Sequence, residues 1–154
     1  MENIPEIVQQ AIALSQQGRP VLLVLSAIQD CGDSQAFAKT LMPVQQSFGE
    51  GLAVTVIQGS HMNRQSNPAA LTDALDYFSY DKVPGDDGPG RRGHFPAGAI
   101  YKDGHEVLRL PSDLRLATIN PQAMADLIGK ATGLAYDKKI LLARVAVVPG
   151  GVDT

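Results

Sequence analysis

The hydrophobic pattern predicts two strands in the N-terminal part of the chain, with a helix between them. Val21–Leu25 is an unbroken apolar run, and Leu52–Ile57 is a second run rich in β-branched residues. Continuous apolar runs of this length are typical of strands buried on both faces, as in a parallel sheet. The segment between them has apolar residues at helical spacing, namely Phe37, Leu41, Met42 and Val44. Strand, helix and strand in this order predict a right-handed, parallel βαβ unit.

Prolines mark two places along the predicted helices. Pro43 lies inside the pattern of the helix that follows the first strand. A proline there removes a backbone hydrogen bond, so we expect it to kink this helix or to end its first part near Met42. Asn3 and Pro5 predict the start of an earlier helix, which ends at Gln16-Gln17-Gly18. The apolar stripe of that first helix is expected to consist of Ile4, Ile7, Ile12 and Leu14.

The second half of the chain predicts a helix, a β-hairpin and another helix. The first of these helices begins at Asn67 or Pro68, and its apolar face is Leu71, Ala74, Leu75 and Phe78. Ala97–Tyr101 and Val107–Leu110 are predicted strands, joined by a tight turn in which Asp103-Gly104 supplies the positive φ angles. The last helix is predicted by a capping asparagine, a proline at the first helical position and a closing glycine: Asn120, Pro121 and Gly133.

Two segments lack this regularity. Ser79–His94 (SYDKVPGDDGPGRRGH) is rich in glycine, proline and charge and is typical of a surface loop. Leu134–Thr154 is compatible with an added helix or with an edge strand, and its periodicity does not separate the two. We therefore expect a domain over residues 1–133, with an insertion at about 79–94, and a C-terminal extension over residues 134–154.

Composition and charge exclude several classes of function. The 13 Lys and Arg residues are outnumbered by 16 Asp and Glu, and the net charge of −3 predicts no basic face for nucleic acid. Tryptophan is absent, which further disfavours base stacking. The apolar runs are shorter than the roughly 18 residues of a membrane span, and the N-terminus lacks the pattern of a signal peptide. The expected location is cytoplasmic.

Cys31 is the only cysteine, so the chain cannot form an internal disulfide. It directly follows the first buried strand and precedes the helix. A strand that delivers a lone thiol to the first turn of a helix is an arrangement that can carry thiol chemistry.

The order of elements and two short motifs resemble the thioredoxin superfamily. Cys31-Gly32-Asp33-Ser34 stands where the family has its CGPC active site, and Phe95-Pro96 stands where it has its cis-proline. The hairpin turn, Tyr101–His105, is similar to the family's F-K-x-G turn. The resemblance covers roughly residues 4–133. It implies an α/β three-layer sandwich, with a mixed sheet of about four strands flanked by helices and without the family's first strand.

The resemblance also implies site residues. Cys31 would be the nucleophile, Ser34 its hydrogen-bonding neighbour, and Phe95 with Pro96 a docking edge that pairs with an extended peptide. The chain departs from the family at four points. Ser34 replaces the second cysteine, Asp30 the tryptophan and Leu25 the buried acid, and the helix proline, Pro43, comes four residues later than in the family. The two-cysteine reaction cycle is therefore unavailable.

The charged groups around Cys31 have opposite effects on the stability of its thiolate. The amides of a helix N-terminus stabilise a thiolate. Asp30 and Asp33 destabilise it, whereas Arg91, Arg92 and His94, on the loop that leads to Pro96, offset them. The sequence does not decide whether these charges together stabilise or destabilise the Cys31 thiolate. Two of the candidate site residues also have structural interpretations. Asp30 is a candidate N-cap of the helix, and Ser34 is a candidate hydrogen-bond partner of the backbone.

Two functions remain as hypotheses. In the first, the single thiol forms mixed disulfides with a protein thiol or with glutathione, which would be a co-substrate. In the second, the chain is a redox-inactive binding or assembly module that uses the loop 79–94 and the tail 134–154, and a dimer through this tail is open. No other cofactor is expected. The three histidines fit no metal-ligand spacing, and Gly85–Gly93 lacks the Lys-Ser/Thr of a phosphate loop.

Overall fold

The computed structural model describes residues 3–78, 94–110 and 120–146. Five α-helices, four strands and two short 3-10 helices are formed in these ranges. In chain order they are α1 (Glu6–Ser15), β1 (Val21–Ser26), α2 (Gly32–Phe48), η1 (Gly49–Gly51), β2 (Ala53–Gln58), η2 (Arg64–Ser66), α3 (Ala69–Tyr77), β3 (Ala97–Lys102), β4 (His105–Leu110), α4 (Pro121–Thr132) and α5 (Lys138–Ala146). None of the helices in the described ranges has the length and apolar character needed to span a bilayer.

The four strands form one mixed sheet in the order β2-β1-β3-β4. β1 is parallel to β2, and Val21 of β1 lies opposite Ala53 of β2. The pairs β1–β3 and β3–β4 are antiparallel. The α/β class, the mixed four-stranded sheet and the parallel βαβ unit are thus confirmed.

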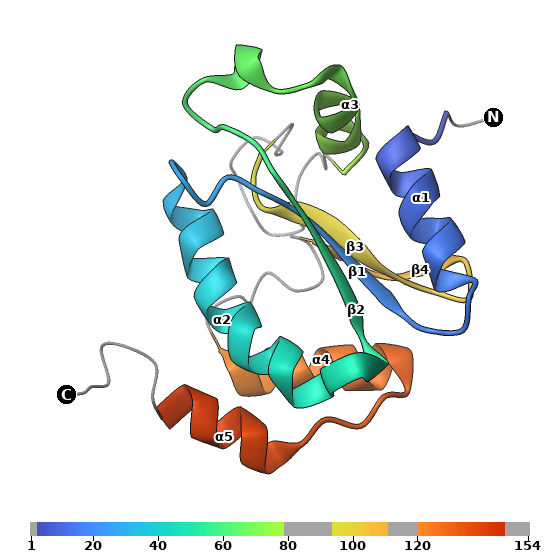
Figure 1. Ribbon diagram of the computed structural model, residues 1–154, viewed down its shortest axis with the longest axis vertical. Coiled ribbons are helices and arrows are strands. Elements are labelled where there is room, and N and C mark those ends of the chain that lie inside the picture. The colour runs from blue at the N-terminus through green and yellow to red at the C-terminus, as the bar shows by residue number, and fades with distance from the viewer. Residues whose placement is uncertain (1–2, 79–93, 111–119, 147–154) are drawn as a thin grey trace, which may run out of the picture.

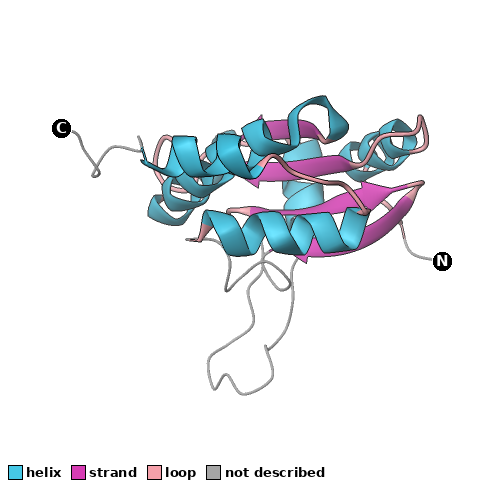
Figure 2. Ribbon diagram, turned by 90° about the horizontal axis from the view of Figure 1, so that it is seen from below, coloured by secondary structure: helices cyan, strands magenta, loops and turns pink. Residues whose placement is uncertain are grey.

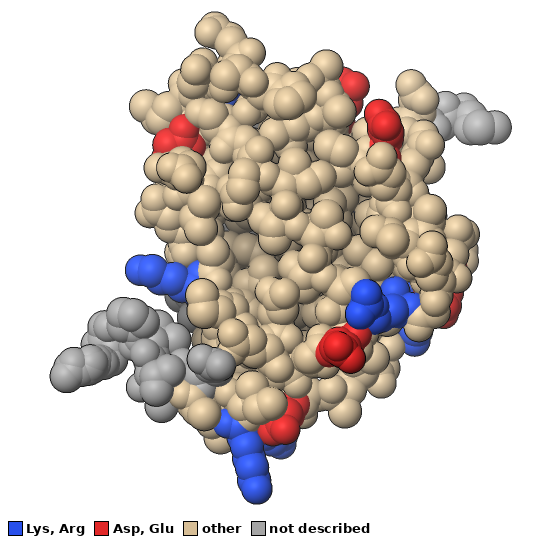
Figure 3. Space-filling view, in the orientation of Figure 1, with Lys and Arg blue, Asp and Glu red and all other residues tan. Residues whose placement is uncertain are grey.

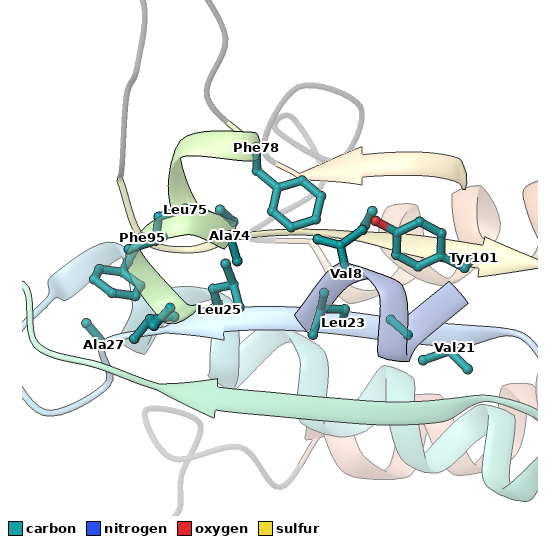
Figure 4. Close-up of a cluster of buried hydrophobic side chains, with 14 of the residues drawn as sticks. Val8, Val21, Leu23, Leu25, Ala27, Ala74, Leu75, Phe78, Phe95 and Tyr101 are labelled. Atoms are coloured by element: carbon teal, nitrogen blue, oxygen red, sulfur yellow. The ribbon is translucent and has the colours of Figure 1, made fainter. Parts of the chain in front are cut away.

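Helices cover both faces of the sheet (Figure 1), and Figure 2 shows the same arrangement from below. The side chains of β1 alternate between two buried clusters, because successive residues of a strand point to opposite faces. Val21, Leu23 and Leu25 pack with residues of α1 and α3, and Figure 4 shows this cluster. Leu22 and Val24 pack with residues of α2, α4 and α5. Burial on both faces explains why β1 is an unbroken apolar run.

Pro43 does not end the central helix. α2 continues through it to Phe48, and in Figure 1 its axis changes direction along its length. An internal proline costs a helix about 3 kcal/mol. Four large apolar side chains of α2 are buried against the sheet, and each is worth about 1.5–3 kcal/mol. They are Phe37, Leu41, Val44 and Phe48. Packing therefore outweighs the proline.

The inner face of α1 also differs from the predicted stripe. Leu14 is 45% exposed, whereas Ser15 is buried. The Ser15 hydroxyl donates to Ile12 O at 2.7 Å and accepts from Gly104 N at 2.9 Å. It thereby ties the end of α1 to the β3–β4 turn, a contact that hydrophobicity alone does not indicate. The helix begins at Glu6 with Pro5 as its N-cap, and no side chain caps it.

The predicted β3–β4 turn and both predicted ends of α4 are confirmed, whereas the predicted Asn3 cap of α1 is wrong. Asp103 and Gly104 have φ angles of 52° and 86°, as the hairpin requires. The Asn120 side chain accepts from Ala123 N at 3.1 Å, and Gly133 ends α4 in the left-handed conformation. The C-terminal segment was predicted as either an added helix or an edge strand. The structure forms a helix there, α5. Its buried Leu141 belongs to the cluster formed with α2 and α4.

Candidate functional site

The thiol of Cys31 lies where strand β1 gives way to helix α2. The amides of Asp30 and Cys31 both donate to Ala27 O, at 3.2 and 2.9 Å, and close a turn at the end of β1. Cys31 is the N-cap residue of α2 and has extended backbone angles. The sequence prediction for the thiol, after a buried strand and at the first turn of a helix, is therefore confirmed.

Cys31 meets Phe95 across a long sequence separation. Cys31 is 8% exposed, and its Sγ donates to Phe95 O at 3.8 Å. The Phe95–Pro96 peptide bond is cis, and β3 begins at the next residue, Ala97. The thiol thus lies beside the main chain of the segment that the sequence predicted as a docking edge.

Ser34 is committed to the backbone. Its side chain is buried, and its Oγ accepts from Ala27 N at 3.0 Å. The hydroxyl therefore secures the turn that presents Cys31. Within the described residues Ser34 and Cys31 are not hydrogen-bonded to each other, so the backbone interpretation of Ser34 is the one that the geometry favours.

Asp30 does not cap helix α2, and that interpretation is wrong. Its carboxylate instead accepts from Ser60 Oγ at 2.6 Å, from His61 N at 2.8 Å and from Met62 N at 3.2 Å. The Ser60 hydrogen bond, followed by that of the His61 amide, lowers the pKa of the Asp30 carboxyl below its ordinary value. Asp30 therefore anchors the loop that follows β2.

Ser60 and the two residues after it were not predicted as part of the site. A topological signal was available, since the carboxyl ends of adjacent parallel strands meet at the same edge of a sheet. Asp30 follows β1, and Ser60 follows β2. Asn67 supports the same loop, because its side chain accepts from Ser60 N at 2.8 Å and donates to Ser60 O at 3.0 Å.

Gly59 allows this loop to lie against Phe95. A Cβ on Gly59 would stand 2.5 Å from Leu71 Cδ2 and 2.9 Å from both Phe95 Cζ and Asn67 Oδ1. These distances are shorter than real Cβ contacts, so only glycine fits without displacing its neighbours. The loop after β2, the start of α3 and the Phe95 ring are therefore packed together next to Cys31.

The charged candidates are only partly described. Asp33 lies in the first turn of α2, and both it and His94 are exposed. Arg91 and Arg92 lie outside the described residues. The offset of Asp30 and Asp33 by these cations thus stays a prediction. Within residues 3–78, 94–110 and 120–146, no group of three or more His, Cys, Asp or Glu side chains could hold a metal ion.

We expect Asp30→Asn to loosen the loop that follows β2. The asparagine keeps the shape and one acceptor oxygen, but its nitrogen cannot accept the hydrogen bonds that Oδ2 accepts from Ser60 and Met62. Amide hydrogen exchange at Met62 should accelerate about tenfold or more because its charged acceptor is lost, and exchange at His61 should accelerate because its acceptor is no longer charged.

The pH dependence of this effect follows from the lowered pKa of Asp30. A carboxyl whose pKa is lower in the folded state stabilises that state above its unfolded pKa, and the contribution is lost as the pH falls through the folded value. Protection of the loop in the natural protein should therefore decrease on acidification, and the Asp30→Asn variant should lack this decrease. Asp73→Asn, an exposed carboxylate on α3, is the control for a lost charge. Equal protection in Asp30→Asn and the natural protein would contradict the anchoring role.

Comparison with known proteins identifies no relative: no protein-family model, no curated protein and no solved structure matches the chain.

Proposed function

We propose that the chain has a thioredoxin-like fold and acts through the single thiol of Cys31, forming mixed disulfides with a protein thiol or with glutathione. The observation that carries the proposal is the contact of Cys31 Sγ, at the N-cap of α2, with the carbonyl of Phe95. It joins a thiol at a helix N-terminus to the main chain that leads into an inner strand of the sheet. The strand order also supports the likeness.

The roles of the residues follow from this contact. Amides at the start of α2 stabilise the Cys31 thiolate once its proton leaves. The same deprotonation removes the S–H donor, so Phe95 O becomes free to accept a hydrogen bond from a partner's main chain. Docking of an extended partner at Phe95 and Pro96 is thereby coupled to formation of the nucleophile. Ser34 acts on the backbone and is a positioning residue.

The reaction is a thiol–disulfide exchange in two steps. The Cys31 thiolate attacks one sulfur of a partner disulfide, forms a new S–S bond and expels the other sulfur as a thiolate, which takes up a proton. A second thiol, from the partner protein or from glutathione, then attacks the mixed disulfide and releases Cys31. The two exchanges together cause no net oxidation or reduction, because each breaks one S–S bond and forms one. The external thiol is required because the chain has no second cysteine.

A second candidate is a redox-inactive binding module. It is favoured by the burial of Cys31, by its hydrogen bond to a carbonyl and by the structural bonds of Asp30 and Ser34. A cysteine held in this way can serve packing alone. In this function, contact surfaces would include the exposed side of α5, where Ile140 and Leu142 lie.

Alkylation of the folded protein tests the proposal. We expect native Cys31 to react with iodoacetamide faster than free glutathione does at neutral pH, and oxidised glutathione to add one glutathionyl group per chain, measured by intact mass. A Cys31→Ser variant should show neither reaction and an unchanged far-ultraviolet circular dichroism spectrum. Slow alkylation together with no glutathione adduct would rule out the thiol function and leave the redox-inactive binding module as the candidate function.

A further inference from the structure

The two edges of the sheet are built differently. β2 and β4 are its outer strands. β4 carries His105, Glu106 and Arg109, and its pairing with β3 contains a register irregularity at Ile100/Tyr101. Charges and bulges are the features by which proteins protect an edge from pairing with another strand. β4 is therefore a protected edge.

Arg109 reinforces the protection of β4. Its guanidinium forms a salt bridge with Glu106 at 2.8 Å and stands over the rings of Tyr77 and Phe78, 5.3 and 5.2 Å from their centroids. It also donates to Tyr77 O at 3.4 Å. These contacts fix a charged group on the outer strand and link it to the end of α3.

β2 has none of these features. Its six residues, AVTVIQ, include no charged residue and no proline. Among the described residues it pairs only with β1, over its whole length. Val56 in its second half is 45% exposed. A strand of this kind is a template for pairing with another strand.

The backbone groups that face outward on β2 can be identified. Ala53 N donates to Pro20 O and Gly59 N to Ser26 O, both toward β1. Backbone groups alternate in direction along a strand, so those of Val54, Val56 and Gln58 face the open edge. An antiparallel partner centred on Val56 satisfies all three of these residues.

The face around this edge is uncharged. The ribbon of β2 passes in front of β1 and β3 in Figure 1. Figure 3 has the same orientation, and there the Lys, Arg, Asp and Glu side chains surround an uncharged middle. A second copy can therefore approach without opposing like charges.

We propose that β2 pairs with β2 of a second copy of the chain, antiparallel and about a two-fold axis midway between the two Val56 residues. Opposite residues of antiparallel strands point to the same face, so a two-fold axis perpendicular to the sheet must set one residue opposite its own copy. At Val56 it sets Val56 against Val56 and Val54 against Gln58 of the partner subunit. A copy of this chain fits because every residue of the strand then meets an uncharged one. The product is a continuous sheet across both copies.

Sedimentation equilibrium over a series of concentrations tests the proposal. A strand pair of this length buries less than the roughly 1,200 Å² of a stable interface, so we expect a concentration-dependent dimer. Val56→Lys sets two like charges against each other and should weaken dimerisation about tenfold or more. Leu14→Lys, which places the same charge on the 45% exposed Leu14 of α1, should leave it unchanged.

Crosslinking tests the register without relying on the lysine variant. In a Cys31→Ser background, Val56→Cys should form a disulfide-linked dimer on mild oxidation, because opposite residues of a hydrogen-bonded pair have Cα atoms about 5.5 Å apart. Gln58→Cys should crosslink poorly, since Gln58 faces Val54 of the other copy. A wild-type protein that stays monomeric at every concentration, or equal effects of Val56→Lys and Leu14→Lys, would overturn the proposal. A monomer whose β2 amides bind an added extended peptide would do the same.

Discussion

Replacing Gly98 with alanine should destabilise the protein by about 3 kcal/mol or more, through a clash that neither strand can relieve. A Cβ at this position would stand 1.9 Å from Leu23 O and 2.9 Å from Leu23 C, which are backbone atoms of β1. The φ angle of Gly98, 155°, is also one that residues with a side chain rarely adopt. Gly98 lies opposite Val24 in the β1–β3 pair, at the centre of the sheet. Relief would require separating the two inner strands.

Chemical denaturation measures this effect. The expected loss is a large part of the roughly 5–15 kcal/mol that stabilises an ordinary domain, so the variant should unfold at much lower urea or be recovered unfolded. Gly32→Ala is the matched control, because a Cβ there meets no atom within 4 Å. It should change the free energy of unfolding by less than about 1 kcal/mol. A Gly98→Ala variant as stable as Gly32→Ala would contradict the close approach of β1 and β3.

The parts of the fold with local signals were predictable from the sequence. The apolar run of β1, the Asp103-Gly104 turn and the Asn120 cap each depend on neighbouring residues, and all three are confirmed. Strong local signals of this kind fix the elements, and short connections then limit how they pair.

Where the prediction failed, a distant contact decided the outcome. Ser15 replaces Leu14 on the inner face of α1 because it binds Gly104. Asp30 turns away from its own helix because the loop after β2 offers it a hydroxyl and two amides. A local pattern cannot reveal partners that only the fold brings together.

The buried hydroxyl of Tyr101 is another feature that the local sequence pattern could not predict. Its hydroxyl is buried and has no hydrogen-bond partner in the described part of the chain. Burial, with the Glu106 carboxylate as a smaller cause, raises the pKa of this phenol above its ordinary value. The sequence predicted Tyr101 as the last residue of a strand and gave no sign of an unpaired hydroxyl in the core.

The candidate site was partly predictable. The position of Cys31 after β1 follows from the local pattern, but its contact with Phe95 was expected only through the resemblance to thioredoxins. Gly59 and Ser60 were missed, since their roles depend on the parallel pairing of β1 with β2. The site is therefore a product of the sheet topology as much as of the motif around the thiol.

Leu141→Ala should detach or strongly weaken α5. Leu141 is fully buried in the cluster formed with α2 and α4, and a buried leucine replaced by alanine typically costs about 2–5 kcal/mol. α5 is also held by Asp137, whose amide donates to Ser47 O at 2.8 Å and whose carboxylate accepts from Lys139 N and Ile140 N. The two carboxylate bonds are exposed, so the leucine should dominate the attachment.

The adjacent leucine supplies the control for this prediction. Leu142 is 61% exposed, so Leu142→Ala removes the same atoms at almost no cost, within about 0.5 kcal/mol. Hydrogen exchange separates two outcomes for Leu141→Ala: faster exchange confined to α5 means that the helix detaches as a unit, and faster exchange throughout means that it stabilises the whole domain. Either result makes α5 part of the core built on α2 and α4. Equal exchange in the Leu141 and Leu142 variants would instead mean that residues 138–146 contribute little to the folded domain.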